Sequence, residues 1–307
     1  MKKLYPDVVP IVVTYNPDKS VLIASLAALL SQVQHIIVVD NDSVCDITEI
    51  TQHLGKECVK RINLIELPYN GGLGKAFNIG IAAARDLNAV FVLLMDQDSI
   101  PASDMVGKLH DGYWNLEKNG VPVGAVAPRY RIGTSSELSR FVRICRFGLT
   151  RVPNDDNINC IRADFLISSG SLIAMRVLDQ VGDMDAGLFI DHIDTEWCFR
   201  AQAKGFALYG ASGAIMQHSL GDKQMHIWWW RWRNISFHQP FRYYYMFRNS
   251  MLLWQRPYMP GAWKRADKLR ILYMLIWFTL FSPNRMANLR MMLKGLKDGF
   301  NRRTGKL

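Results

Sequence analysis

The sequence predicts an α/β fold, with a mainly parallel sheet flanked by helices, followed by a helical C-terminal region. Short β-branched strands alternate with helical segments over the first 130 residues, and those strands are apolar on both faces. The composition becomes aromatic and basic after about residue 220, where we place a loose boundary. A chain of 307 residues that is 49% hydrophobic can bury a large core and is not disordered.

Four strands and two helices are expected in the first part of the chain. The strands are Val8–Val13, His35–Val39, Ile62–Leu67 and Val90–Met95, and the helices are Ser20–Leu30 and Leu73–Arg85. Further along, Phe165–Ala174 is expected to form two strands around a polar kink. Asp194–Lys204 reads as a helix that Gly205 closes.

The positive charge is concentrated at the end of the chain. Arg256–Lys306 holds twelve Lys and Arg against two acidic residues, which equals the net charge of +10 of the whole chain. A basic end indicates an anionic partner, either a membrane surface or nucleic acid. Within it, Ile271–Phe281 reads ILYMLIWFTLF, too short for a bilayer span of about 20 residues. The run is interpreted either as a helix at the lipid interface or as a buried core helix, and the sequence leaves both open. The segment Trp228–Arg233 is a second candidate membrane anchor.

The cysteines indicate a reduced, cytoplasmic protein. They are scattered, odd in number and form no C-x-x-C pair, at Cys45, Cys58, Cys145, Cys160 and Cys198. This pattern predicts neither a zinc site nor a disulfide framework.

Polar residues follow each of the four predicted strands. They are Thr14-Tyr15-Asn16, Asp40-Asn41-Asp42-Ser43, Asn70-Gly71-Gly72 and Asp96-Gln97-Asp98. Each group alone would be an ordinary turn. Ligands of open α/β sheets bind beyond the carboxyl ends of the strands, so the four groups together predict a site.

Asp96 and Asp98 are candidate metal ligands, because two carboxylates directly follow the apolar strand VFVLLM. Hard cations such as Mg²⁺ and Mn²⁺ prefer oxygen ligands and a share of substrate phosphate. Such an ion neutralises the charge of a departing diphosphate. An isolated D-x-D triplet is usually a solvated turn, and the buried strand before it favours the metal site. His218 would complete the ligand set or be a structural histidine.

A glycine-rich turn enters the second predicted helix with the sequence NGGLGKAFNIG, which includes Lys75. Backbone N–H groups at a helix start favour anions. Ala76 stands where a phosphate-binding P-loop needs Ser or Thr, and Phe77 where the dinucleotide fingerprint needs its third Gly. Kinase, ATPase and dehydrogenase interpretations are therefore weakened. The alternative to an anion-binding role is a tight turn that allows close packing of the helix.

The segment Phe189–Trp197 clusters three carboxylates and a histidine, namely Asp191, His192, Asp194 and Glu196. A transferase needs a base that takes a proton from an acceptor hydroxyl. Asp194 is the candidate base, although an Asp just ahead of a helix is also a common N-cap. Asp191 and His192 would contact an acceptor or lie in an exposed loop.

Taken together and in order, these segments resemble the inverting family 2 glycosyltransferases with the GT-A (Rossmann-like) fold. The likeness covers roughly residues 8–250 and is greatest to bacterial rhamnosyltransferases of O-antigen and rhamnolipid assembly. It rests on VVTYN, Val-Asp-Asn after the second strand, N-x-G-x-x-x-A-x-N-x-G, D-x-D, LISSG, FIDHIDTE and RYYYMFRN. It implies a catalytic domain over 1–220, with a nucleotide-sugar half of about 1–130 and an acceptor half of about 131–220, and a membrane-associating helical extension over 221–307.

The resemblance also implies roles for residues of this chain. Asp194 would be the general base, and Asp98, His218 and Asp96 would hold the metal. The residues that would bind the nucleotide sugar are Thr14, Tyr15, Asn16, Asp40, Asn70, Gly71, Lys75 and Asp96. The acceptor-side candidates are Ser169, Gly170, Asp191, His192 and Glu196. Ile193 replaces the first acid of the family's usual pair, which leaves the helper roles of Asp191 and Glu196 open.

The activity implied is a metal-dependent, inverting transfer of L-rhamnose from dTDP-β-L-rhamnose to a polyprenyl-diphosphate-linked oligosaccharide. The cofactor would be Mg²⁺ or Mn²⁺, and the product would serve O-antigen, lipopolysaccharide or other cell-surface polysaccharide synthesis. The protein would be peripheral on the cytoplasmic face of the cell membrane and would bind no nucleic acid. The alternatives are transfer of galactofuranose, GlcNAc or glucose, a glycoside hydrolase, or a non-catalytic membrane- or nucleic-acid-binding protein.

Overall fold

The computed structural model describes residues 3–132, 137–145, 148–153, 158–218, 224–229, 231–236, 238–282 and 284–307. The boundary expected near residue 220 and the side chains of the Trp228–Arg233 anchor candidate lie outside this description.

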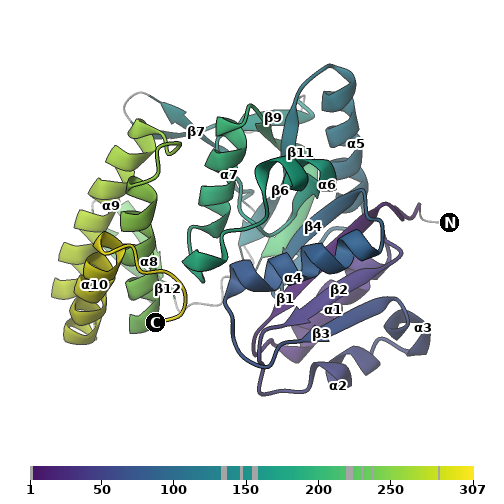
Figure 1. The fold of residues 1–307 in the computed structure, drawn as a ribbon, viewed down its shortest axis with the longest axis horizontal. Helices are drawn as coiled ribbons and strands as arrows, with labels where there is room; N and C mark the ends of the chain where they lie inside the picture. The colour runs from purple at the N-terminus through teal and green to yellow at the C-terminus, as the bar shows by residue number, and fades with distance from the viewer. Residues whose placement is uncertain are drawn as a thin grey trace.

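The first half of the chain forms the parallel part of the sheet (Figure 1). Its strands lie in the order β3-β2-β1-β4, and all pair in parallel. They are β1 (Val8–Thr14), β2 (Ile36–Asp40), β3 (Ile62–Glu66) and β4 (Phe91–Asp96). The helices between them are α1 (Lys19–Leu30), α2 (Ile47–Gln52), α3 (Lys56–Val59) and α4 (Leu73–Asp86). The predicted alternation of strand and helix is confirmed, and β1 and β2 are fully buried as their apolar sequences require.

The second half extends the same sheet with strands of both directions. β10 (Ser171–Ala174) pairs antiparallel with β4 and with β6 (Val123–Ile132), and β6 pairs in parallel with β11 (Ala207–His218). The edge strands β5 (Ser99–Pro101) and β9 (Cys160–Ala163) both pair antiparallel with β11. The complete sheet is therefore mixed, with its parallel pairs concentrated in the first half. The helices α5 (Met105–Lys118) and α6 (Met175–Val181) follow β5 and β10.

The prediction of two strands in Phe165–Ala174 is half wrong. The second becomes β10, but Phe165 forms only an isolated bridge with Val142, in β7 (Val142–Cys145), which pairs with β8 (Gly148–Arg151). A turn centred on Ser169 and Gly170 interrupts the run, since Gly170 has a φ of +82°.

The glycine-rich segment at the start of α4 serves the packing of that helix. A Cβ on Gly80 would lie 2.3 Å from Cγ2 of Ile11 in β1, so only glycine allows this approach. The Asn78 side chain donates to the Met184 carbonyl at 2.8 Å and accepts from the Met184 N–H at 2.9 Å. Both residues therefore fix α4 against its surroundings.

The C-terminal helices form a layer at one side of the sheet (left in Figure 1). They are α8 (Pro240–Trp254), α9 (Gly261–Leu280) and α10 (Arg285–Phe300). β12 (Gln224–Trp229) and β13 (Arg231–Ser236) pair antiparallel and precede them. The 3₁₀ helix η1 (Ala186–Leu188) comes before α7 (Ile193–Ala203), and α7 lies between the C-terminal helices and the sheet (Figure 1). Within the described residues, no helix is long and apolar enough to cross a membrane.

The apolar run Ile271–Phe281 is neither wholly core nor wholly interface. Ile271, Trp277 and Phe278 are buried in the cluster that joins α9 to α8 and α10. The opposite face of the same run is exposed, at Leu272, Tyr273, Ile276, Leu280 and Phe281. The core interpretation is therefore confirmed for one face of the helix, and the lipid-interface interpretation stays a prediction for the exposed face.

Candidate active site

A cavity of about 730 Å³ opens at the carboxyl ends of β1 and β4. Its wall contains many of the residues proposed from the sequence: Thr14, Tyr15, Asn70, Asp96, Asp98, Asp191, His192, Asp194 and His218. These residues come from both halves of the sheet and from the loop before α7. The position agrees with the general placement of ligand sites in open α/β sheets.

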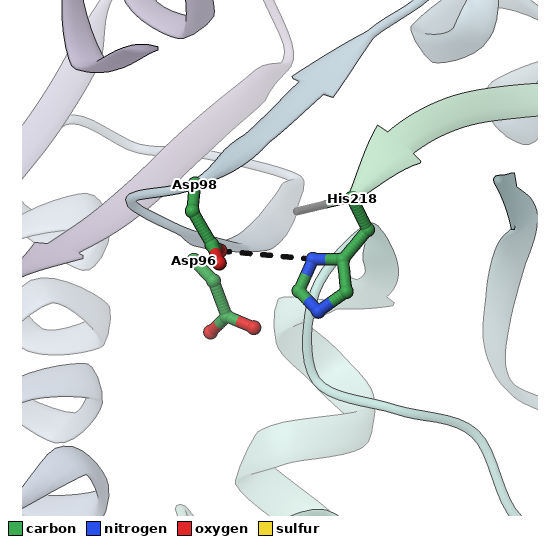
Figure 2. A group of neighbouring side chains, drawn as sticks. All are labelled: Asp96, Asp98 and His218. Atoms are coloured by element: carbon green, nitrogen blue, oxygen red, sulfur yellow. Dashed lines mark ion pairs between the residues drawn. The ribbon is translucent and has the colours of Figure 1, made fainter. Parts of the chain in front are cut away.

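Asp96, Asp98 and His218 form a compact cluster in this cavity (Figure 2). One potential ligand atom from each lies within 4.8 Å of the others, and His218 Nδ1 is 3.6 Å from Asp98 Oδ1. Asp96 ends β4, while Asp98 directly precedes β5. His218 ends β11 and is the register partner of Ser99 in β5, so strand pairing brings the histidine to the two carboxylates.

The charge balance of the cluster favours a cation. The pKa of Asp96 is raised to about 7, first by burial and then by the negative charges of Asp98 and Asp194, although Arg242 opposes the shift. Two carboxylates and an imidazole are suitable ligands for Mg²⁺ or Mn²⁺. The residues present therefore fit a divalent metal ion.

Two buried serines connect the arms of this cluster. Ser99 Oγ is 2.7 Å from His218 Nδ1, and Ser169 donates to Ser99 Oγ at 2.7 Å. Ser169 Oγ also accepts the Asp96 N–H at 3.2 Å. A Cβ on Gly170 would lie 2.4 Å from Cγ of Pro128, so this glycine serves close packing. The acceptor-side assignment of Ser169 and Gly170 is therefore corrected, because neither lines the cavity and both support its framework.

Asp40 lies behind the cavity wall. Its Oδ1 accepts from Thr14 Oγ1 at 2.7 Å and from Ser43 Oγ at 2.6 Å, and its Oδ2 accepts from the Ser43 N–H at 2.9 Å. Asp40 is 5% exposed, whereas Thr14 lines the cavity. The carboxylate thus orients Thr14, and a direct contact between Asp40 and a nucleotide stays a prediction.

Side-chain amides join the loop after β1 to the loop after β4, and the loop after β2 to the loop after β3. Gln97 accepts the Tyr15 N–H at 2.7 Å and donates to the Tyr15 carbonyl at 3.2 Å. Asn41 accepts the Gly71 N–H at 2.9 Å and donates to Asn70 Oδ1 at 3.1 Å. Tyr15 and Asn70 line the cavity, and Gly71 lies just behind them.

Asn16 and Lys75, both expected to bind the nucleotide sugar, lie away from the cavity lining. Asn16 has a φ of +48° and donates its N–H to Ser43 Oγ at 2.8 Å, as a turn residue does. Lys75 Nζ bonds the Tyr69 hydroxyl and lies 4.7 Å from the centre of the Tyr69 ring. In this conformation neither side chain reaches the cavity.

Asp194 lies in the first turn of α7 and faces the cavity. The N-cap is His192, with no capping side-chain bond, so the alternative role of Asp194 as the cap is wrong. Burial raises the pKa of Asp194, while hydrogen bonds from Thr195 and from the Ser168 backbone lower it in part. The net upward shift makes the carboxylate a better proton acceptor than an exposed one.

Glu196 points away from the cavity and is 1% exposed. Its carboxylate pairs with Arg200 and with Arg256, each at 2.9 Å, and accepts from the Tyr258 hydroxyl. These partners join α7 to the segment between α8 and α9. The acceptor-side assignment of Glu196 is corrected, because its oxygens are engaged within the protein.

Several cavity residues were not expected from the sequence, and three of them come from the C-terminal region: His238, Phe241 and Arg242. Arg242 Nη2 lies 3.3 Å from Asp191 Oδ1. The RYYYMFRN block was the available signal for Arg242, whereas His238 had none. Tyr130 of β6 was also missed, and its ring packs edge-on against His218 at 5.8 Å.

Comparisons with known proteins identify the family of the chain. The model of the family described as Glycosyl transferase family 2 matches residues 11–179. A protein of Shigella flexneri named dTDP-rhamnosyl transferase RfbF is 29% identical over 302 residues, which cover 96% of each chain.

Two solved structures are similar in fold. One is GalNAc-T7 with UDP, GalNAc and Mn²⁺, with a TM-score of 0.58, 13% identity and 96% of this chain covered. This chain spans 56% of GalNAc-T7, about half its length. The other is residues 1–349 of S. aureus TarS in complex with UDP-GlcNAc, with a TM-score of 0.56 and 14% identity. That match covers 97% of this chain and 80% of the TarS chain.

Proposed function

The chain belongs to glycosyltransferase family 2, and from this premise we propose that it is a metal-dependent, inverting rhamnosyltransferase. As a family member it is a glycosyltransferase with the GT-A fold. The observation that carries the proposal is the shared cavity, in which the base candidate Asp194 lies close enough to Asp96 to raise the pKa of that carboxyl. A proton acceptor and a candidate diphosphate site thus share one cavity.

The proposed donor is dTDP-β-L-rhamnose. Its support is the likeness to the Shigella dTDP-rhamnosyl transferase, which extends over nearly the whole of both chains. On the proposed nucleotide side, the cavity is lined by Thr14, Tyr15 and Asn70. The choice of sugar rests on the sequence likeness and not on these side chains. Transfer of another nucleotide-linked sugar, such as galactofuranose, GlcNAc or glucose, is the alternative within the family.

Asp96, Asp98 and His218 would hold the Mg²⁺ or Mn²⁺ ion. When bound, the ion supplies positive charge that stabilises the departing diphosphate. The protein's own contribution is a fixed set of ligands, because Ser99 and Ser169 hold His218 and the Asp96 backbone in place.

The reaction is a single displacement with Asp194 as the base. The acceptor hydroxyl gives its proton to the Asp194 carboxylate, and its oxygen attacks the anomeric carbon. As the new C–O bond forms, the bond from that carbon to the diphosphate oxygen breaks, and dTDP leaves with the electron pair. Attack comes from the face opposite the leaving group, so a β-linked donor gives an α-linked product.

The proposed acceptor is a polyprenyl-diphosphate-linked oligosaccharide at the cytoplasmic membrane surface. The exposed apolar side chains of α9, such as Leu272 and Ile276, support this location. Exposed Arg265 and Lys268 on the same helix would favour anionic lipid headgroups. The proposed products belong to O-antigen or related cell-surface polysaccharides.

A ligand-stabilisation screen tests the donor. Purified protein would be heated with dTDP-, UDP- and GDP-sugars in the presence of Mn²⁺, Mg²⁺ or a chelator. The largest rise in melting temperature is expected with dTDP-rhamnose and a metal ion. In a separate transfer reaction with an acceptor, NMR spectra should show an α-linked product. Stabilisation by UDP-sugars alone would overturn the sugar assignment. An equal rise in melting temperature with the donor in the presence of a chelator would contradict the proposed metal dependence.

A further inference from the structure

The RYYYMFRN block of α8, residues 242–249, has no role in the mechanism above, yet four of its side chains, those of Arg242, Tyr245, Arg248 and Asn249, contact one loop. That loop, residues 187–192, includes the last two residues of η1, leads to α7 and carries Asp191 and His192 into the cavity. It also sets the direction of the first turn of α7, where Asp194 lies.

The loop has an unusual backbone conformation. Phe189, Asp191 and His192 have φ angles of +65°, +62° and +63°. Residues other than glycine rarely adopt positive φ angles, and Phe189, with a ψ of −64°, has the strained geometry of a γ-turn closed by the Ile190 N–H and the Leu188 carbonyl at 2.8 Å. Such a conformation persists only where surrounding contacts hold it, and it is concentrated at functional sites.

Asn249 provides the most direct of these contacts. Its Nδ2 donates to the carbonyl oxygens of Leu188 at 2.9 Å, Ile190 at 2.7 Å and Asp191 at 2.9 Å. Its Oδ1 accepts from Arg248 Nε at 3.0 Å and Nη2 at 2.8 Å. Asn249 is fully buried, so one amide side chain ties three carbonyl groups of the loop to α8.

The neighbours of Asn249 reinforce this attachment. Arg248 Nη2 donates to the Leu188 carbonyl at 2.8 Å, and its guanidinium lies 4.9 Å from the centre of the Tyr245 ring. The Tyr245 ring stacks on Phe189 with 4.8 Å between centroids and an interplanar angle of 13°. Phe189, with its strained backbone, is thus held through both its backbone neighbours and its ring.

We propose that Asn249, with Arg248 and Tyr245, positions the acceptor side of the active site. These residues hold the positive-φ residues of loop 187–192 in place, so that Asp191, His192 and Asp194 face the acceptor. They touch no reacting atom and act only through the loop. The assignment of the loop to the acceptor rests on the proposed function, whereas the attachment itself does not.

The test uses Asn249→Ala and the nearly isosteric Asn249→Asp, which keeps an oxygen for Arg248 but cannot donate to the carbonyls. Hydrogen exchange of the Phe189 and Ile190 amides, measured without substrates, should become at least about tenfold faster. The kcat/KM for the acceptor should fall about 100-fold, because small misplacements of reacting groups have effects of this size. The affinity for the nucleotide sugar should change less than about twofold.

Two further variants keep the result interpretable. Asn288→Ala removes a buried amide in α10 that donates to Ser282 Oγ at 2.7 Å, far along the chain from the loop, and should change neither readout. If the Asn249 variants do not fold, Tyr245→Leu removes the stack on Phe189 and should give the same pattern more weakly.

Unchanged exchange in loop 187–192, or an equal loss of donor and acceptor affinity, would overturn the positioning role. If the variants exchange faster but the wild type itself transfers sugar to no acceptor, the result contradicts the proposed function. The attachment of the loop to α8 would still stand.

Discussion

Arg242 of α8 forms an ion pair with Asp191 of the loop before α7, with 3.3 Å between Nη2 and Oδ1. The Arg242 charge also lowers the pKa of Asp96, which otherwise rises through burial and neighbouring carboxylates. A region expected to be a membrane-associating extension therefore also supplies part of the cavity wall. Deleting that region would damage the active site, so membrane binding needs a test with point substitutions.

Replacing the base should stop the reaction without affecting donor binding. Asp194→Asn removes the proton acceptor but keeps the side-chain size, and we expect kcat to fall by about 10²–10⁴-fold. The affinity for the nucleotide sugar, measured by calorimetry, should stay unchanged. A variant with wild-type kcat would exclude Asp194 as the base.

The raised pKa of Asp194 predicts the pH dependence of the wild-type reaction. A base must be deprotonated to act, so kcat should fall as the pH drops through the pKa of Asp194. Because burial raises this pKa, the acid limb of the profile should lie above the ordinary aspartate value of about 4. A profile of kcat against pH that is flat down to the ordinary value would contradict this assignment.

Loss of a metal ligand should affect the donor as well as the reaction. Asp98→Asn removes one carboxylate charge from the Asp96–Asp98–His218 cluster, so Mn²⁺ affinity should fall by more than the roughly 10–100-fold that loss of an outer-shell partner causes. Titration of free Mn²⁺ by electron paramagnetic resonance measures this directly, and donor binding in the presence of Mn²⁺ should weaken in parallel. Asp104→Asn, at an exposed aspartate at the start of α5, is the matched control.

The sequence predicted the parallel part of the sheet and the position of the candidate metal ligands Asp96 and Asp98 for the same physical reason. Strands buried on both faces are continuous apolar runs, such as VVPIVVT and FVLLMD, and their ends are marked by polar residues. Once the strands are assigned, topology alone brings Thr14, Asn70 and Asp96 to one edge.

Other parts of the site depend on long-range pairing that leaves no local pattern. His218 reaches Asp98 because β11 pairs with β5, which is only three residues long. The roles of Ser169 and Glu196 are set by neighbours distant in sequence, Ser99 and Arg256. A polar residue in a motif can support the framework or line the cavity, and its sequence pattern does not distinguish the two.

The exposed face of α9 should bind anionic membranes. Leu272→Glu combined with Ile276→Glu places two negative charges on this exposed face. Each substitution also removes an apolar side chain whose full burial in the lipid would contribute roughly 1.5–3 kcal/mol to the free energy of binding. Binding to vesicles that contain phosphatidylglycerol, measured by co-sedimentation, should fall at least about tenfold. Leu87→Glu, at an exposed leucine after α4, is the control. Equal vesicle binding by the double variant would direct attention to the Trp228–Arg233 segment.

Gly80 should be intolerant of any side chain. A Cβ at this position would meet Cγ2 of Ile11 at 2.3 Å and Cγ2 of Val39 at 3.3 Å, in the packed interface between α4 and the sheet. Gly80→Val should lower the free energy of unfolding by about 1–3 kcal/mol, since overpacking forces the helix outward. Urea unfolding measures the change. Gly261→Ala, in a helix where the nearest atom would be 3.6 Å away, should be neutral or slightly stabilising.

His192 should make the folded state sensitive to acid. Burial, followed by the nearby charge of Arg270, lowers the pKa of His192 to about 4, and Arg270 Nη2 lies 3.0 Å from its Nε2. In the unfolded chain the imidazole takes up a proton below about pH 6.5, whereas in the folded chain it stays neutral until about pH 4. Lowering the pH through this interval therefore favours unfolding, by about 2 kcal/mol between pH 7.5 and pH 5.

His192→Asn isolates this contribution, because Asn also tolerates a φ of +63° but does not titrate. Urea unfolding of both proteins at several pH values cancels the effects of other titrating groups, including Asp96. The stability of the wild type relative to the variant should be greatest near pH 7.5 and should decline steadily below pH 6.5. A difference that does not change with pH would mean that His192 titrates normally in the folded protein, and that Arg270 does not keep it neutral.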